Sequence, residues 1–184
     1  DAVPAHIPVS AKMRLGYMDR HFMLDNAHAI EDAGAAWVTV HARTKADGYT
    51  PPAFWDQLRP IREALKINVI ANGEIWNNAD AKQCRLESGC EDLMIGRGAV
   101  TIPDLTQCIR QNIDTPLLTW NELLTLQIRF LNGGYKKEMN MVGRYKQWLG
   151  MMSKHYPEAK ALWDEVKRIK PLDDIILKLN ASST

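Results

Sequence analysis

Short apolar segments alternate with segments of helical spacing through the first 116 residues, and this alternation is the feature that most constrains the fold. Each apolar segment suits one buried strand, whereas the segments between them place apolar residues three or four positions apart. The units repeat about every 25–30 residues, the length that a right-handed crossover between parallel strands needs. The predicted order is strand 7–15, helix 21–33, strand 37–40, helix 52–65, strand 67–71, helix 77–89, strand 93–95 and helix 103–111.

Polar residues stand at or near the carboxyl ends of all four predicted strands. They are Lys12 and Arg14, then His41, then Asn72, then Gly96-Arg97. In a (β/α)8 barrel or an open α/β sheet, this edge is where ligands bind. A barrel needs eight strand–helix units and about 250 residues, so four units amount to half of one.

The stretch Gly96-Arg97-Gly98 follows the last apolar run and precedes Pro103, which suits the first turn of a helix. Two glycines allow a tight turn and close approach to the backbone, and the arginine adds a fixed positive charge. Such a loop can present backbone N–H groups to a phosphate. The same residues also fit an ordinary turn between a strand and a helix, and the stretch alone does not decide between the two interpretations.

After Pro116 only helical spacing remains, which predicts a small helical domain of three or four helices. Thr119 and Glu122 form the pattern of a capping box at its start. The predicted domains are therefore residues 1–116 and residues 117–184. Between residues 129 and 146 the helical part is rich in Lys and Arg, with tyrosines interleaved. That composition suits either a footprint for RNA phosphates or a solvated helix face.

Composition excludes several classes of protein. The net charge of +1 argues against a generally basic nucleic-acid binder, although residues 119–184 hold 11 Lys and Arg against 7 Asp and Glu. Three cysteines without a CxxC pair indicate a reducing compartment, in keeping with the cytoplasm, and predict no structural zinc. The sequence contains no apolar run of the roughly 18 residues that a membrane span needs, and no signal-peptide pattern.

Four motifs in order and spacing resemble the flavin-binding half of the tRNA-dihydrouridine synthases. They are Lys12-Met-Arg-Leu-Gly16, Val40-His-Ala-Arg-Thr44, Asn72-Gly-Glu-Ile75 and Gly96-Arg-Gly-Ala99. The resemblance extends over essentially all 184 residues, and residues 40–52 together with the helical tail look most similar to the bacterial C subgroup. It implies a fold class of the C-terminal half of a (β/α)8 barrel, about four βα units, followed by a small helical domain.

The resemblance also implies an activity. Members of the family bind FMN in an eight-stranded barrel, use NADPH as the reductant, and reduce a flipped-out uridine in the D-loop of tRNA to dihydrouridine. A cysteine protonates the other carbon of the former double bond, and the helical domain helps to hold the tRNA.

Carried onto this chain, the resemblance places Lys12 and His41 against the polar edge of the flavin ring. Fixed positive charge or donors at that edge stabilise an anionic reduced flavin. His41 could instead be a buried histidine of the core, and Glu74 could simply favour the N-terminus of the next helix. The remaining candidates for the ribityl chain and the phosphate are Asn72, Gly73, Glu74, Gly96 and Arg97.

A second set of residues is expected to face tRNA. Its members are cations, taken from strand ends and from the basic helical segment. They are Arg14, Arg43, Lys45, Lys136, Lys137, Arg144 and Lys146.

One family motif is absent from these residues. The catalytic cysteine of the family lies in Asn-x-Gly-Cys-Pro, and Cys84, Cys90 and Cys108 do not match that pattern. No catalytic residue is assigned, and the chain is expected to be the C-terminal portion of an enzyme and to be inactive alone. The complete enzyme is expected to be a monomer, whereas a half-barrel with bare strand edges is expected to self-associate or to pack loosely.

Two other functions stay open. A phosphate-binding barrel that acts as an isomerase or lyase on a phosphorylated metabolite would explain the Gly-Arg-Gly stretch. A non-catalytic RNA-binding module would explain the basic tail.

Overall fold

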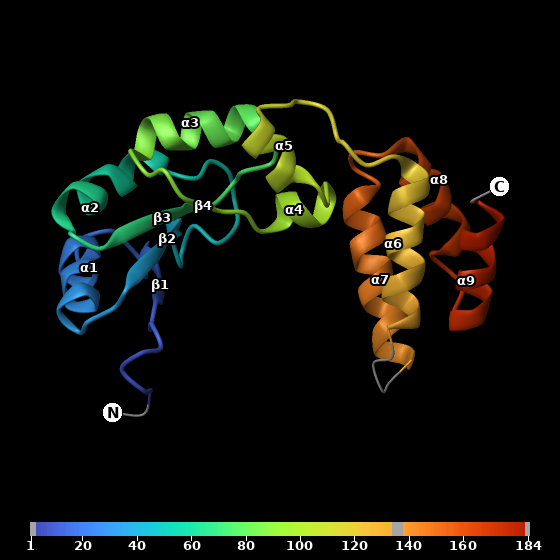
Figure 1. Ribbon diagram of the computed structural model, residues 1–184, viewed down its shortest axis with the longest axis horizontal. Coiled ribbons are helices and arrows are strands. Elements are labelled where there is room, and N and C mark those ends of the chain that lie inside the picture. Colours follow the sequence, from blue (N-terminus) through green and yellow to red (C-terminus); the bar gives the residue numbers. More distant parts are fainter. Residues whose placement is uncertain (1–2, 134–137, 183–184) are drawn as a thin grey trace. The chain divides into compact units, whose positions relative to one another are not determined.

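The computed structural model describes residues 3–133 and 138–182, without the side chains of residues 138–140. The chain divides into two compact units, residues 1–98 and residues 99–184 (Figure 1). The first unit is built on a parallel sheet, and the described residues of the second form helices and no strand. The domain boundary expected after residue 116 stays a prediction.

The sheet has four parallel strands in the consecutive order β1-β2-β3-β4. Because each strand is added beside the one before it, right-handed crossovers place the connecting helices on the same face, as in a barrel wall. The α/β fold class is confirmed as part of such a barrel followed by helices. Its elements are β1 Ala11–Gly16, α1 Met23–Asp32, β2 Trp37–Thr44, the 3-10 helix η1 Trp55–Leu58, α2 Arg59–Ala64, β3 Asn68–Asn72, α3 Asn78–Ser88 and β4 Leu93–Met94.

The two faces of the sheet differ in chemistry. The face that the helices cover is apolar and fully buried, with Leu15, Val38, Val40 and Val69 in its core. On the other face, parallel register places polar residues of successive strands side by side. The row runs Arg14, His41, Asn72 and then Met94, each paired with the next across the sheet. Successive side chains of a strand point to opposite faces, so one face of the sheet forms the core and the other carries the site.

Two predicted elements begin elsewhere. The helix expected from Pro52 starts at η1, because residues 51–54 run beside β2 and the backbone N–H of Phe54 donates to the carbonyl of Ala42 at 2.8 Å. Helix α4, Arg97–Thr101, begins inside the Gly96-Arg97-Gly98 stretch, which was expected to be a loop. The helix expected from Pro103 is α5, Leu105–Gln111. The side chain of Asn77 caps the N-terminus of α3, and Gly89 ends the helix in a left-handed conformation.

The helical unit surrounds one apolar core. Thr119 caps the first of its longer helices and forms the predicted capping box with Glu122. One polar pair is buried in this core, where the Tyr145 hydroxyl donates to Oε1 of Gln127 at 3.0 Å. The helices after α5 are α6 Trp120–Asn132, α7 Glu138–Met152, α8 Pro157–Val166 and α9 Leu172–Ala181. In the described part of the chain, none of the helices has the length and apolar character to cross a membrane.

Candidate functional site

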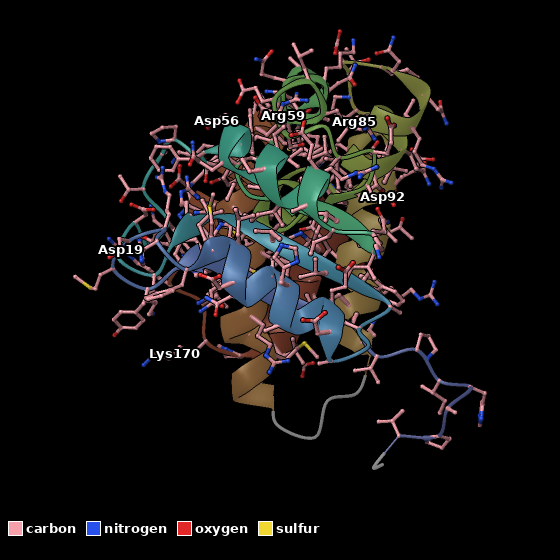
Figure 2. The ribbon with its side chains drawn as sticks, turned by 90° about the vertical axis from the view of Figure 1, so that its left-hand side faces the viewer. Asp19, Asp56, Arg59, Arg85, Asp92 and Lys170 are labelled. Atoms are coloured by element: carbon pink, nitrogen blue, oxygen red, sulfur yellow. The ribbon has the colours of Figure 1, made fainter. Side chains whose placement is uncertain are left out.

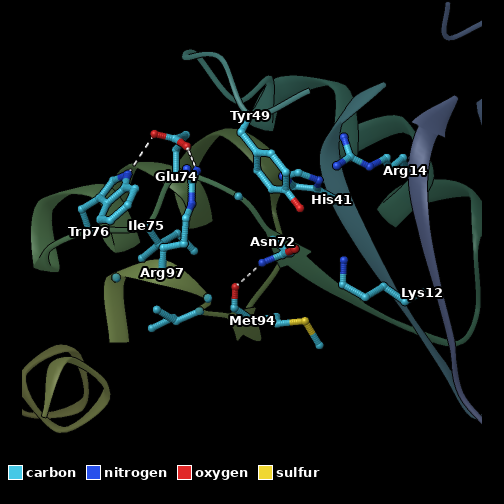
Figure 3. A pocket seen from close by; sticks show the side chains of 14 residues that line it. Lys12, Arg14, His41, Tyr49, Asn72, Glu74, Ile75, Trp76, Met94 and Arg97 are labelled. Atoms are coloured by element: carbon cyan, nitrogen blue, oxygen red, sulfur yellow. Dashed lines mark hydrogen bonds and ion pairs between the residues drawn. The ribbon is translucent and has the colours of Figure 1, made fainter. Parts of the chain in front are cut away.

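A cavity of about 450 Å³ opens at the carboxyl ends of the strands (Figure 3). That volume lies within the range of small-molecule sites. Residues from all four strand ends line it, and all seven predicted cofactor-binding residues are among them. These are Lys12, His41, Asn72, Gly73, Glu74, Gly96 and Arg97, joined by Arg14 from the predicted tRNA-facing set.

Lys12 and Arg14 reach the cavity from β1, because residues two apart on a strand point to the same side. Lys12 is exposed, and Figure 3 shows its side chain pointing into the cavity. Arg14 is partly buried, and its Nη1 donates to the carbonyls of Thr44 at 2.7 Å and Gly48 at 3.1 Å. Arg14 therefore holds the loop after β2 in place while it lines the cavity.

His41 lies on β2 between these cations and β3. Burial, followed by the positive charges of Arg14 and Lys12, lowers its pKa to about 4. The imidazole is therefore neutral at neutral pH, with one ring nitrogen as a donor and the other as an acceptor. Gly73 lies against this ring: with φ of +125°, a Cβ there would stand 3.0 Å from Cδ2 of His41. Only glycine fits this position without strain.

Glu74 follows in a left-handed conformation, with φ of 51°. Its Oε1 lies 3.1 Å from Nη2 of Arg43 and 2.6 Å from Nη2 of Arg97, and Oε2 accepts from the Trp76 indole N–H at 2.8 Å. Burial alone would raise the pKa of Glu74, but the Trp76 hydrogen bond and the two guanidinium groups outweigh it and lower that pKa. The carboxylate of Glu74 is thus ionised, its charge is balanced by the two guanidinium groups, and it holds both arginine side chains in place.

Arg97 stands between two aromatic rings at the rim of the cavity. Its guanidinium carbon is 4.9 Å from the centre of the Tyr49 ring and 5.0 Å from that of Trp76. The Tyr49 ring also lies 5.4 Å from the guanidinium of Arg14. A Cβ at Gly96 would meet no atom within 4 Å, so the backbone beside Arg97 is open to a ligand.

Sequence reasoning missed the aromatic and apolar part of the cavity. Tyr49 and Trp76 stand on loops, and nothing in their local spacing marks them. Met94 could have been found, because it follows Asn72 across the sheet in the polar row. The further apolar lining consists of Ile75 and Ile95. A cavity with apolar walls and several cations suits a planar ligand that carries negative charge.

The residues expected to face tRNA are spread over the molecule. Arg43 does not face outward, which corrects the prediction: its side chain is 0% exposed, and its Nε donates to the carbonyl of Pro52. Lys45 and Arg144 are exposed. Lys146 donates to the carbonyls of Lys167 at 3.0 Å and Ile169 at 2.6 Å. Lys136 and Lys137 lie outside the described residues.

The three cysteines are buried and stand apart from the cavity. Burial raises the pKa of Cys84 to about 12 and also raises the pKa values of Cys90 and Cys108. Each is therefore a neutral thiol at neutral pH, as expected of structural cysteines.

The family model of dihydrouridine synthases matches residues 1–174 of this chain. The chain belongs to the dihydrouridine synthase family. The match includes the sheet, the cavity and nearly all of the helical unit.

Individual members of the family are similar over nearly the whole chain. A tRNA-dihydrouridine(16) synthase of Shewanella oneidensis is 44% identical over 95% of the chain and 56% of its own length. One of Pseudomonas syringae is 44% identical over 99% of the chain and 59% of its own length. One of Haemophilus influenzae is 41% identical over 97% and 58%. The chain thus spans somewhat more than half the length of these curated relatives.

Proposed function

We propose that this chain is part of a flavin-dependent tRNA-dihydrouridine synthase, in which the cavity binds FMN and NADPH is the reductant. The observation that carries the proposal is the convergence of all seven predicted cofactor residues on one cavity, in a chain of this family. A reduced flavin bound there would supply the hydride that reduces the C–C double bond of a D-loop uridine in tRNA.

The residues of the cavity fit such a cofactor by their charge. Lys12 would give the ring a fixed positive charge at its polar edge, and neutral His41 would offer an N–H donor beside it. Met94 and Ile95 would cover the ring and keep water away from it. Arg97, held by Glu74, and the backbone at Gly96 would receive the phosphate.

No residue of the cavity is assigned as the donor of the proton that completes the reduction. The 184 residues contain no Asn-x-Gly-Cys-Pro motif, and none of the buried cysteines lines the cavity. We therefore propose that these residues bind, orient and shield the reactants, and that alone they do not turn over.

The helical unit is proposed to contact tRNA, with Arg144 as the exposed cation of α7. Lys45, on the loop after β2, is the candidate in the first unit, and both stay predictions. A cytoplasmic location and a monomeric full-length enzyme are part of the same proposal.

Lys12→Ala in the full-length protein tests the proposal. We expect FMN to bind about tenfold to a hundredfold more weakly, because one charge-assisted interaction is lost, and dihydrouridine formation to fall with it. Fluorescence titration with FMN and quantification of dihydrouridine in tRNA measure the two effects. Lys154→Ala is the matched control, since Lys154 is exposed in the helical unit.

The proposal is wrong if Lys12→Ala leaves both measurements at the level of the Lys154→Ala control. A phosphorylated metabolite that binds the cavity while FMN does not would favour the isomerase or lyase instead.

A further inference from the structure

The loop between β1 and α1 exposes three large apolar side chains within six residues. Tyr17 is 71% exposed, Met18 73% and Phe22 62%. Single exposed apolar residues are common on protein surfaces, but a contiguous group indicates a contact surface. The loop follows directly from the strand whose Lys12 and Arg14 line the cavity, so it stands at the same edge of the sheet.

The loop has a fixed conformation. Gly16 has φ of +157°, and a Cβ there would lie 1.8 Å from the carbonyl oxygen of Asp19, so the turn requires glycine. The Asp19 carboxylate accepts a hydrogen bond from the backbone N–H of His21 at 2.9 Å. Figure 2 shows Asp19 at the outer edge of the view, on this loop. Specific contacts therefore fix the turn of the chain at this loop.

The neighbouring loop after β2 supports it from the side. The backbone N–H groups of Lys45 and Ala46 donate to the carbonyls of Gly16 at 2.9 Å and Tyr17 at 2.8 Å. The guanidinium carbon of Arg20 lies 3.8 Å from the centre of the Phe54 ring, and its Nη2 lies 4.0 Å from Oδ2 of Asp47. With both loops tied together, the three apolar side chains stay in solvent although the backbone that carries them is ordered.

The charge around these side chains favours a polyanion. Residues 12–22 and 45–49 hold four Lys and Arg against two acids. Both acids, Asp19 and Asp47, already accept hydrogen bonds from backbone N–H groups of their own loops. Lys45 is exposed beside the loop. Aromatic rings set among cations are what single-stranded nucleic acid needs, since its bases stack on the rings while its phosphates meet the cations.

We propose that the loop of residues 17–22 is a stacking surface for unpaired nucleobases of the RNA substrate, next to the cavity. The inference rests on the proposed function and adds to it the residues that hold the RNA at the entrance of the site. Tyr17 and Phe22 supply the ring faces, and Met18 supplies apolar contact between them. Because every base has a π-face, this surface grips unpaired RNA without reading its sequence.

Tyr17→Ala and Phe22→Ala in the full-length protein test the inference, with unmodified tRNA as the probe. We expect tRNA to bind about 5- to 150-fold more weakly for each stacked base that is lost. The slope of log K against log salt stays unchanged, because no phosphate contact is removed. Tyr17→Phe keeps the ring and restores binding. Leu86→Ala on α3 is the matched control, since Leu86 is 70% exposed.

Fluorescence anisotropy gives the tRNA affinities, FMN titration checks that the cavity is intact, and thermal unfolding checks the fold. The inference is overturned if the wild-type protein binds tRNA and the loop variants bind it as well as Leu86→Ala does. It is also overturned if the variants keep their tRNA affinity but lose self-association in light scattering, since the surface then joins proteins. A wild-type protein that does not bind tRNA overturns both this inference and the proposed function.

Discussion

In residues 1–98, Lys12, Arg14 and Arg97 face one cavity together with the neutral imidazole of His41. In residues 99–184, by contrast, the cations with defined partners are engaged along the helices and at their ends. Asp164 pairs with Lys160 and Lys167, and Lys178 pairs with Glu165. Lys146 binds two backbone carbonyls near the end of α8.

The difference follows from secondary structure. Parallel strands bring their carboxyl ends to one edge, so polar residues at successive strand ends meet even when they are about 30 residues apart in sequence. A helix instead distributes its charges around its axis, where partners on the next turn or at a nearby helix end can take them up. A polar residue at a strand end is therefore a better indicator of a site than a basic run on a helix.

The largest expected difference between the two units is in how a glycine-to-alanine substitution, made once in each unit, changes the free energy of unfolding. Gly73→Ala forces φ of +125° on an alanine and sets its Cβ 3.0 Å from the His41 ring, so we expect a loss of about 2–4 kcal/mol in the free energy of unfolding. Gly143→Ala on α7 meets no atom within 4 Å and should stabilise the protein by about 0.5–1 kcal/mol. Urea denaturation measures both. If both substitutions change the free energy of unfolding in the same direction, the tight packing inferred at Gly73 is wrong.

Acid and alkali should act on different units. The pKa of His41 is about 4 in the folded protein against 6.5 in the unfolded chain. Between these values only the unfolded chain binds the proton, so the free energy of unfolding falls as pH drops, by at most about 3 kcal/mol. His41→Gln should flatten this acid branch. Denaturation from pH 7.5 to pH 4 tests it, and an equally steep branch in the variant would exclude His41 as its source.

In the helical unit, stability depends on pH in the opposite direction. Burial raises the pKa of Tyr145 above its ordinary value of 10.0. The folded protein therefore keeps a proton that the unfolded chain loses, and stability is full below pH 10 and declines above it. Tyr145→Phe should remove this alkaline decline while it costs about 1–2 kcal/mol at neutral pH, because Gln127 loses the hydroxyl that donates to it. A variant that is as stable as the wild type at neutral pH would contradict the hydrogen bond.

Sequence patterns predicted the sheet, its order of elements and the polar strand-end residues that converge on the cavity, because strand ends of parallel units must share an edge. Gly73 and Glu74 were added by the resemblance to the family. The patterns did not predict Tyr49 and Trp76, which reach Arg97 only through the shapes of two loops. Arg43 was placed wrongly for a related reason. The strand was expected to end near His41, but β2 continues to Thr44, so Arg43 is enclosed within the fold.

The smallest expected effects distinguish Lys146 from Arg144, two cations of α7 that were both predicted from sequence to face tRNA. Lys146 donates to the carbonyls of Lys167 and Ile169, so Lys146→Ala leaves these acceptors near the end of α8 without their ammonium group. We expect the free energy of unfolding to fall by about 1–2 kcal/mol. The slope of log K against log salt for tRNA should stay as it is, because an ammonium group that binds the backbone is not available to a phosphate.

Arg144→Ala is expected to act on RNA binding. Its side chain is exposed, so the guanidinium can reach a phosphate of bound RNA. If the guanidinium meets one phosphate, the magnitude of the salt slope should fall by about 0.7 to 0.9. Anisotropy titrations at several salt concentrations, beside thermal unfolding of both variants, decide the matter. A flatter slope for Lys146→Ala with unchanged stability would mean that its ammonium group leaves the two carbonyls when RNA binds, and that the helical unit presents more charge to RNA than its free structure indicates.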